Sequence, residues 1–283
     1  MIAILGGLGA AAAWALSTLC SSRSSRLIDP ASVVAWMMLV GLLITVPLAA
    51  LSGVPARLGP GSGAWLVAAG LGNVVGLVLT YRALRIGQVA LVAPLVSTEG
   101  AVAAVIALIA GEPLAAGVAL TLAVIVAGVW MASAPDRNRT ADPASHPTAA
   151  IVLAMAAALA FGASLYTTAR AGAELPVSWV VLSARAIGVV ALALPLALTG
   201  RLQLTRPAVP LVVASGVCEV LGFYAYTTGS RHDIAVAAVL ASQVGGLAAL
   251  GGYFAFGERL TRKRTLGVCT MLAGVAVLSA LRA

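Results

Sequence analysis

Three ionisable residues, Glu99, Arg185 and Glu219, lie inside long apolar segments of this sequence. A charge at the centre of a membrane helix costs roughly 2.5–3.5 kcal/mol on insertion scales, so we expect none of the three to face lipid. A carboxylate in an apolar environment has its charged form disfavoured and can exchange a proton near neutral pH, and a guanidinium can hold a carboxylate. Two interpretations therefore stand: a binding site in which Glu99 or Glu219 carries a proton and Arg185 binds an anion, or a structural Glu–Arg pair.

Other polar and aromatic side chains fall at similar depths. These further candidates for a substrate or ion site are Asn73, Ser97, Gln243, Trp14 and Tyr224. Asn73 precedes Glu219 by 146 positions, and Ser97 precedes Gln243 by the same number. Two related polar pairs predict one central chamber. For the two rings, ordinary packing in the protein interior is the simpler interpretation.

The composition requires a membrane environment for these residues. Of 283 residues, 61% are hydrophobic and 9% charged, and the mean hydropathy is +1.06. Spanning about 30 Å of hydrocarbon takes about 20 apolar residues, so the chain has room for about ten helical spans. We predict an all-α integral membrane protein with spans at 2–20, 32–51, 64–81, 89–110, 115–133, 148–168, 178–198, 209–228, 234–256 and 265–281.

The two halves of the chain repeat each other. Gly111-Glu112 and Gly257-Glu258 differ by 146 positions, as do the Ala-Gly-Val segments at 127–129 and 273–275. Because each half holds an odd number of spans, the second half must cross the membrane in the opposite sense. We therefore predict two inverted five-helix repeats, residues 1–133 and 148–283, joined by a polar linker at 134–147.

The fourth predicted helix of each repeat ends in "GEPL" (111–114) or "GERL" (257–260), and a short apolar helix with "AGV" follows. In this the chain resembles the EamA-like branch of the drug/metabolite transporter superfamily. The resemblance implies solute transport, usually export, without naming a solute. Many members carry a proline in the fourth helix of each repeat, where this chain has Glu99 and Gly245. Glu112 and Glu258 are interpreted as structural, each following the glycine that ends a helix and capping the next.

The basic residues indicate an orientation. The formal net charge is +8, but the arginines are spread over short turns and form no patch, which argues against nucleic-acid binding. Twelve Lys and Arg residues fall on one predicted side and four on the side of the N-terminus, so the positive-inside rule places both termini outside the cytoplasmic membrane. The resemblance implies the reverse for many ten-helix members. The three cysteines have no metal-binding spacing, and neither a metal nor a cofactor is expected.

Three functional classes fit a chain of this kind unequally. A secondary transporter, moving a small solute with protons as the candidate coupling ion, accounts for the repeats and the intramembrane polar residues. A membrane enzyme is disfavoured because His146 and His232 lie in loops and no HExxH or GxSxG motif occurs. A non-transporting scaffold or lipid-handling protein is the alternative. Arg185 would suit an anion or amino acid, and a free Glu a cationic drug or polyamine. A monomer or a homodimer is compatible with ten helices.

Overall fold

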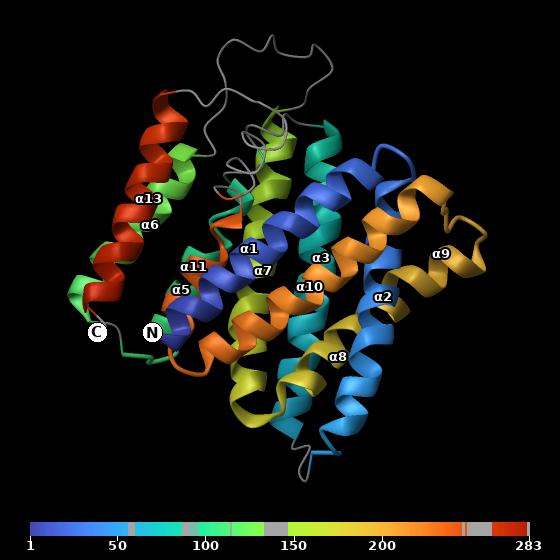
Figure 1. Ribbon diagram of the computed structural model, residues 1–283, viewed down its shortest axis with the longest axis horizontal. Helices are drawn as coiled ribbons and strands as arrows, with labels where there is room; N and C mark the ends of the chain where they lie inside the picture. The colour runs from blue at the N-terminus through green and yellow to red at the C-terminus, as the bar shows by residue number, and fades with distance from the viewer. Residues whose placement is uncertain are drawn as a thin grey trace.

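The computed structural model describes residues 1–55, 60–86, 92, 95–113, 115–132, 147–244, 247 and 262–281, and this part of the chain is a bundle of helices (Figure 1). The "GERL" segment and Gly245 lie outside these residues, as does the linker predicted at 134–147 except for its last residue, Pro147, which begins a helix. The prediction of an all-α protein is confirmed for the described part.

Four of the five helices described in the first half lie over the predicted spans, and α5 covers only the second part of its span. They are α1 (Ile2–Ser24), α2 (Pro30–Leu51), α3 (Pro60–Ile86), α5 (Glu99–Ile109) and α6 (Ala116–Ala132). Asp29 caps α2 by accepting a hydrogen bond from the backbone N–H of Ala31 at 3.0 Å, and Pro30 fits the first helical position. Gly111 ends α5 with φ +88°, and Glu112 N–H donates to the carbonyl of Ala107, which is a Schellman C-cap.

The second half contains α7 (Pro147–Glu174), α8 (Val177–Gly188), a π-helical segment (Val189–Ala193), α9 (Leu194–Leu198), a 3₁₀ turn (Arg206–Ala208), α10 (Val209–Ser230), α11 (Ile234–Ala241) and α13 (Arg262–Leu281). The segment from α8 to α9 forms one apolar stretch, Val177–Leu198. Among the described residues, six stretches are long and apolar enough to cross a membrane, and α5 and α6 are shorter apolar helices.

Many large apolar side chains face outward from the bundle. Leu43, Leu51, Ile109 and Leu120 are each more than two thirds exposed. In water such a surface would drive aggregation, but in a bilayer it meets lipid tails. The apolar surface and the apolar helices together identify an integral, multi-pass membrane protein.

The helices pack in pairs that join the two halves of the chain. In Figure 1, α1 lies beside α10, α3 beside α7, and α6 beside α13 at one edge of the bundle; α2 also packs on α8, and α5 on α11. Glycines permit the closest approaches: a Cβ at Gly6 would overlap Gly229, and one at Gly72 would overlap the backbone of Ala160. Helices in lipid associate largely through such close backbone packing, since burial of apolar surface gives no advantage there.

Two helices are interrupted where continuous spans are predicted. Ser97 and Thr98 form a turn before α5, and Ser242 and Gln243 form a turn after α11. The prediction of one continuous helix over 89–110 is wrong, because Glu99 is the first residue of α5 instead of a residue near the middle of a helix. The Thr98 hydroxyl donates to the carbonyl of Leu95, and Ser242 Oγ donates to that of Val239, so each turn supplies a side-chain donor to the helix end before it.

Candidate functional site

Arg185 and Glu219 face each other between α8 and α10. Arg185 has an exposed fraction of 0% and Glu219 one of 8%, so the pair is buried in the bundle. Arg185 Nη2 lies 3.7 Å from Glu219 Oε1. Charge-assisted hydrogen bonds between such groups are typically about 2.7–2.9 Å long. The two groups therefore attract each other electrostatically without forming a close hydrogen bond.

The guanidinium of Arg185 keeps unused hydrogen-bonding capacity. Its Nη1 donates to Met38 Sδ at 3.2 Å, a weak acceptor, and its Cζ lies 4.6 Å from the ring centroid of Phe223. Its Nε and Nη2 have no hydrogen-bond partner. Gly41 of α2 makes room for the side chain, because a Cβ there would lie 2.7 Å from Arg185 Cδ. The N–H groups on these two nitrogens thus remain available for an acceptor such as a carboxylate.

Glu99 is the carboxylate that Arg185 leaves unpaired. The charge of Glu219 acts on Glu99, and the charge of Glu99 acts on Tyr226, which places Glu99 near the same polar region. In the part of the chain that the structure describes, no ion pair of Glu99 occurs. It is the first residue of α5 and so lies at the N-terminal end of that helix.

The other polar candidates are buried with incomplete hydrogen bonding. Asn73 on α3 is 5% exposed and Gln243 is 1% exposed, and Asn73 Oδ1 and Gln243 Nε2 have no partner. Ser97 lies in the turn before α5. No hydrogen bond among the described residues joins these three side chains to one another. A single central chamber stays a prediction.

The two aromatic candidates differ in their surroundings. Trp14 packs against Phe223 with ring centroids 5.2 Å apart at 68°, and against Tyr226 at 6.1 Å. Tyr224 is partly buried, and both its hydroxyl and Trp14 Nε1 lack a hydrogen-bond partner. Trp14 thus lies one ring away from the guanidinium, through Phe223. Sequence reasoning missed Phe223, although it is four residues from Glu219 and so on the same helix face.

Glu112, expected to cap the next helix, forms an ion pair with Arg170. Its carboxylate lies 3.4 Å from Arg170 Nη1, with both side chains about 40% exposed. No acid lies in the first turn of α6. The Glu112 carboxylate pairs with Arg170 from α7, and the capping role expected of Glu112 stays a prediction. The glycine before it ends α5 as expected.

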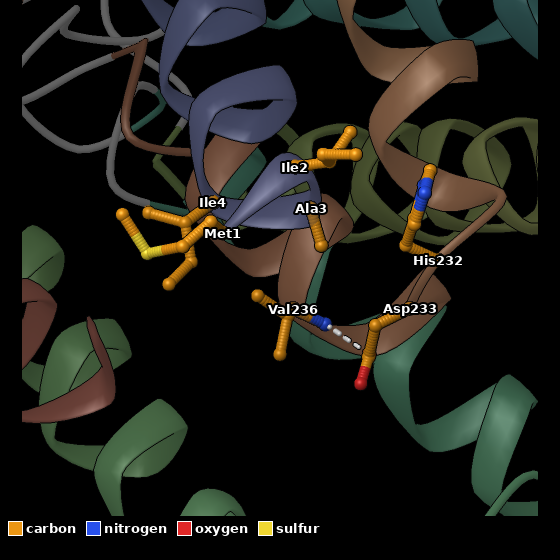
Figure 2. Close-up of a pocket in the computed structure, with 7 residues that line it drawn as sticks. All are labelled: Met1, Ile2, Ala3, Ile4, His232, Asp233 and Val236. Atoms are coloured by element: carbon orange, nitrogen blue, oxygen red, sulfur yellow. Dashed lines mark hydrogen bonds between the residues drawn. The ribbon is translucent and has the colours of Figure 1, made fainter. Parts of the chain in front are cut away.

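Two cavities open at the end of the molecule where α1 begins. One has a volume of 270 Å³ and lies between the first residues of the chain and the His232–Asp233 corner (Figure 2). The other, of 230 Å³, is lined by the same corner together with Ala107 and Glu112. Ile2 is twelve residues from Trp14, about 18 Å along α1 at 1.5 Å per residue. The first cavity thus lies far from Arg185 and Glu219, and neither cavity is lined by these two residues.

Comparison with known proteins agrees with the helical architecture. The model of the EamA-like transporter family matches residues 1–134. A solved structure titled only "Crystal structure of protein" superposes with a TM-score of 0.81 over 99% of this chain and 96% of that chain, at 19% identity, and therefore shares the fold. No curated protein matches the sequence. The resemblance to drug/metabolite transporters that the "GEPL" segment indicates is confirmed.

Proposed function

We propose that this chain, whose residues 1–134 are similar to the EamA-like transporter family, is a secondary transporter that moves a small solute bearing an anionic group across the cytoplasmic membrane. The observation that carries the proposal is the buried guanidinium of Arg185, with Nε and Nη2 unpaired and its acidic neighbour 3.7 Å away. A carboxylate can bind an arginine through two parallel hydrogen bonds, which Glu219 does not form. Amino acids and other carboxylate-bearing metabolites or drugs are the solute class that such a site would take.

The helix pairings support two inverted repeats of five spans each. In such repeats α1, α2 and α3 correspond to α7, α8 and α10. The α1–α10 contact then corresponds to the α7–α3 contact, and the α2–α10 contact to the α8–α3 contact. The pairs α2–α8 and α6–α13 each exchange with themselves. Transporters built this way bind solutes near the membrane midplane, beside interrupted helices. The turns at Ser97–Thr98 and Ser242–Gln243 interrupt the fourth helix of each proposed repeat at nearly the same place.

Solute binding and protonation are linked through Arg185. When Glu219 is charged, it competes with the solute carboxylate for the guanidinium. When Glu219 binds a proton, Arg185 becomes an unpaired buried cation, and the solute anion restores its partner. The proton and the solute therefore bind together and move in the same direction. Export follows when the outward solute gradient exceeds the inward proton gradient.

The proposal is tested by solute exchange in proteoliposomes. Carboxylate-bearing amino acids should exchange, whereas polyamines and cationic drugs should not. Arg185→Gln should abolish exchange because it removes the one buried cation that the described part of the chain places near Glu219. Arg170→Gln is the matched control: it removes the same group from another ion pair, but from an exposed one.

Three results would contradict the proposal. Equal exchange by Arg185→Gln and Arg170→Gln would exclude Arg185 as the binding residue. Exchange of cationic solutes alone would assign the site to a free carboxylate instead. A folded protein that exchanges no solute would favour the non-transporting scaffold or lipid-handling role.

A further inference from the structure

A chain of buried hydroxyl groups runs between α1 and α10. Ser17 Oγ and Ser215 Oγ are 2.8 Å apart, and Ser21 Oγ and Ser215 Oγ are 2.7 Å apart. Each of the three serines is at most 6% exposed. The hydroxyl of Ser215 thus joins those of Ser17 and Ser21, which lie one helical turn apart on α1.

Both ends of this chain meet an ionisable side chain. The carboxyl group of Glu219 lies next to the Ser17 hydroxyl, and the phenol of Tyr81 lies next to the Ser21 hydroxyl. Ser21 is three residues from the end of α1, and Tyr81 is five residues from the end of α3. Tyr81 is partly exposed and is followed by the exposed Arg82. The hydroxyls therefore extend from the buried pair toward the membrane face where α1 and α3 end.

We propose that Ser17, Ser215, Ser21 and Tyr81 form a proton path that connects Glu219 to the arginine-rich face of the membrane. This inference rests on the proposed function, in which Glu219 takes up and releases a proton. Tyr81 receives a proton from water at its oxygen as it gives its own to Ser21. Ser21, Ser215 and Ser17 in turn each accept one proton and release one. The proton that Ser17 releases bonds to a carboxylate oxygen of Glu219. No hydroxyl gains net charge, and one proton is transferred in total.

The corresponding positions of the other half lack such a chain. Ser164 on α7 corresponds to Ser17, and Ala69 on α3 corresponds to Ser215. The Ser164 hydroxyl donates to the backbone carbonyl of Ala69, which has no side-chain hydroxyl. Asn73 corresponds to Glu219, Thr168 to Ser21, and Thr227 to Tyr81. Thr168 Oγ1 and Thr227 Oγ1 are buried without a hydrogen-bond partner. In an inverted repeat this second set would lead to the opposite membrane face, so the path opens to one face only.

Helix packing alone does not require the serine arrangement. The Ser164 contact shows that one hydroxyl donating to a backbone carbonyl is enough at an equivalent crossing, at 2.7 Å. The α1–α10 crossing has the same kind of contact, Ser17 Oγ to the carbonyl of Ser215 at 3.2 Å. The hydroxyl-to-hydroxyl contacts are additional to it.

Several ionisable groups lie close enough to Glu219 to interact with it electrostatically. They are Tyr81 from α3, Glu99 from α5, Arg185 from α8 and Cys218 from α10, with Cys20 from α1 beside Cys218. Arg185 is the cation in this set. Because the hydroxyl chain meets Glu219 from α1, it approaches the carboxylate separately from the guanidinium on α8.

The path is tested by the rate at which Glu219 binds a proton, without any solute. Infrared difference spectra of the reconstituted full-length protein after a pH jump follow the C=O band of the protonated carboxyl group, assigned as the band that Glu219→Gln removes. Ser17→Ala should slow the appearance of this band about tenfold or more, as removal of a proton-transfer group does. Ser17→Thr keeps a hydroxyl and should keep the rate. Ser164→Ala removes the equivalent packing contact and should leave the rate unchanged.

Three outcomes would overturn the path. The first is an unchanged protonation rate in Ser17→Ala. The second is an equal loss of rate in Ser164→Ala, which would show that packing accounts for the effect. The third is the absence of any band that Glu219→Gln removes. Because the readout contains no solute, failure here leaves the solute-exchange test of Arg185 standing. Failure of that exchange test leaves the measured proton rate interpretable.

Discussion

Ser17 and Ser164 make the same contact at two crossings of the fold. Ser17 Oγ donates to the backbone carbonyl of Ser215 on α10, and Ser164 Oγ donates to that of Ala69 on α3. The donors are 147 positions apart and the acceptors 146. An aromatic ring follows the same relationship: Trp14 of α1 packs on Gly222, and Phe161 of α7 packs on Gly76. Both observations are what the proposed pair of repeats, with diverged interiors, would produce.

The aromatic contacts on glycine predict a loss of stability on adding one methyl group. Gly222→Ala and Gly76→Ala should each lower the free energy of unfolding by about 1–3 kcal/mol, because the new Cβ would overlap a ring. Gly117→Ala on α6 is the control, since a Cβ there meets no atom within 4 Å. Unfolding by dodecyl sulfate in mixed micelles measures the difference. Equal stability of all three variants would contradict the close contacts.

The buried ion pair predicts a non-additive effect on stability. Arg185→Met leaves Glu219 as a buried charge with no counter-ion and should cost about 3–5 kcal/mol. Adding Glu219→Gln should recover most of that loss, because the remaining charge is removed. The double variant should be folded and unable to exchange solute. If the two losses simply add, Arg185 and Glu219 do not act as a pair.

The sequence leaves either Glu99 or Glu219 as the proton-carrying group, and the pairing with Arg185 distinguishes them. Glu99→Gln should retain solute-linked proton movement, because protonation of Glu219 is what frees Arg185 for the solute. The number of protons moved per solute, measured with a pH-sensitive dye in the vesicle lumen, should equal that of the wild type. Loss of proton movement in Glu99→Gln would assign the coupling proton to Glu99 instead.

The orientation from the charge count can be checked by cysteine labelling. Val54 lies on the side of the N-terminus and is 78% exposed, and Thr205 is exposed on the arginine-rich side. In a background without the three native cysteines, a membrane-impermeant thiol reagent should label Val54→Cys in intact cells and Thr205→Cys only after permeabilisation. The reverse pattern would place both termini in the cytoplasm, and the hydroxyl path would then open outward.

The positions of the helices could be predicted from the sequence more fully than the contacts between them. The apolar runs at 32–51 and 209–228 match α2 and α10 within two residues at each end, because apolar length and Pro or Asp breakers determine helix ends. The break at Ser97–Thr98 was missed because it lies in a long apolar run with neither Pro nor Asp at the break. The contacts of Arg185 with Met38 and Phe223 depend on how three helices pack, and no spacing within one segment encodes that.

The most direct test of the central claim is solute-induced proton movement in proteoliposomes that hold a pH-sensitive dye. With a carboxylate-bearing solute, wild-type protein should move protons and solute in the same direction, and Glu219→Gln should exchange the solute without moving protons. Opposite directions of movement, or unchanged proton movement in Glu219→Gln, would contradict the claim that a proton on Glu219 releases Arg185 to bind the solute.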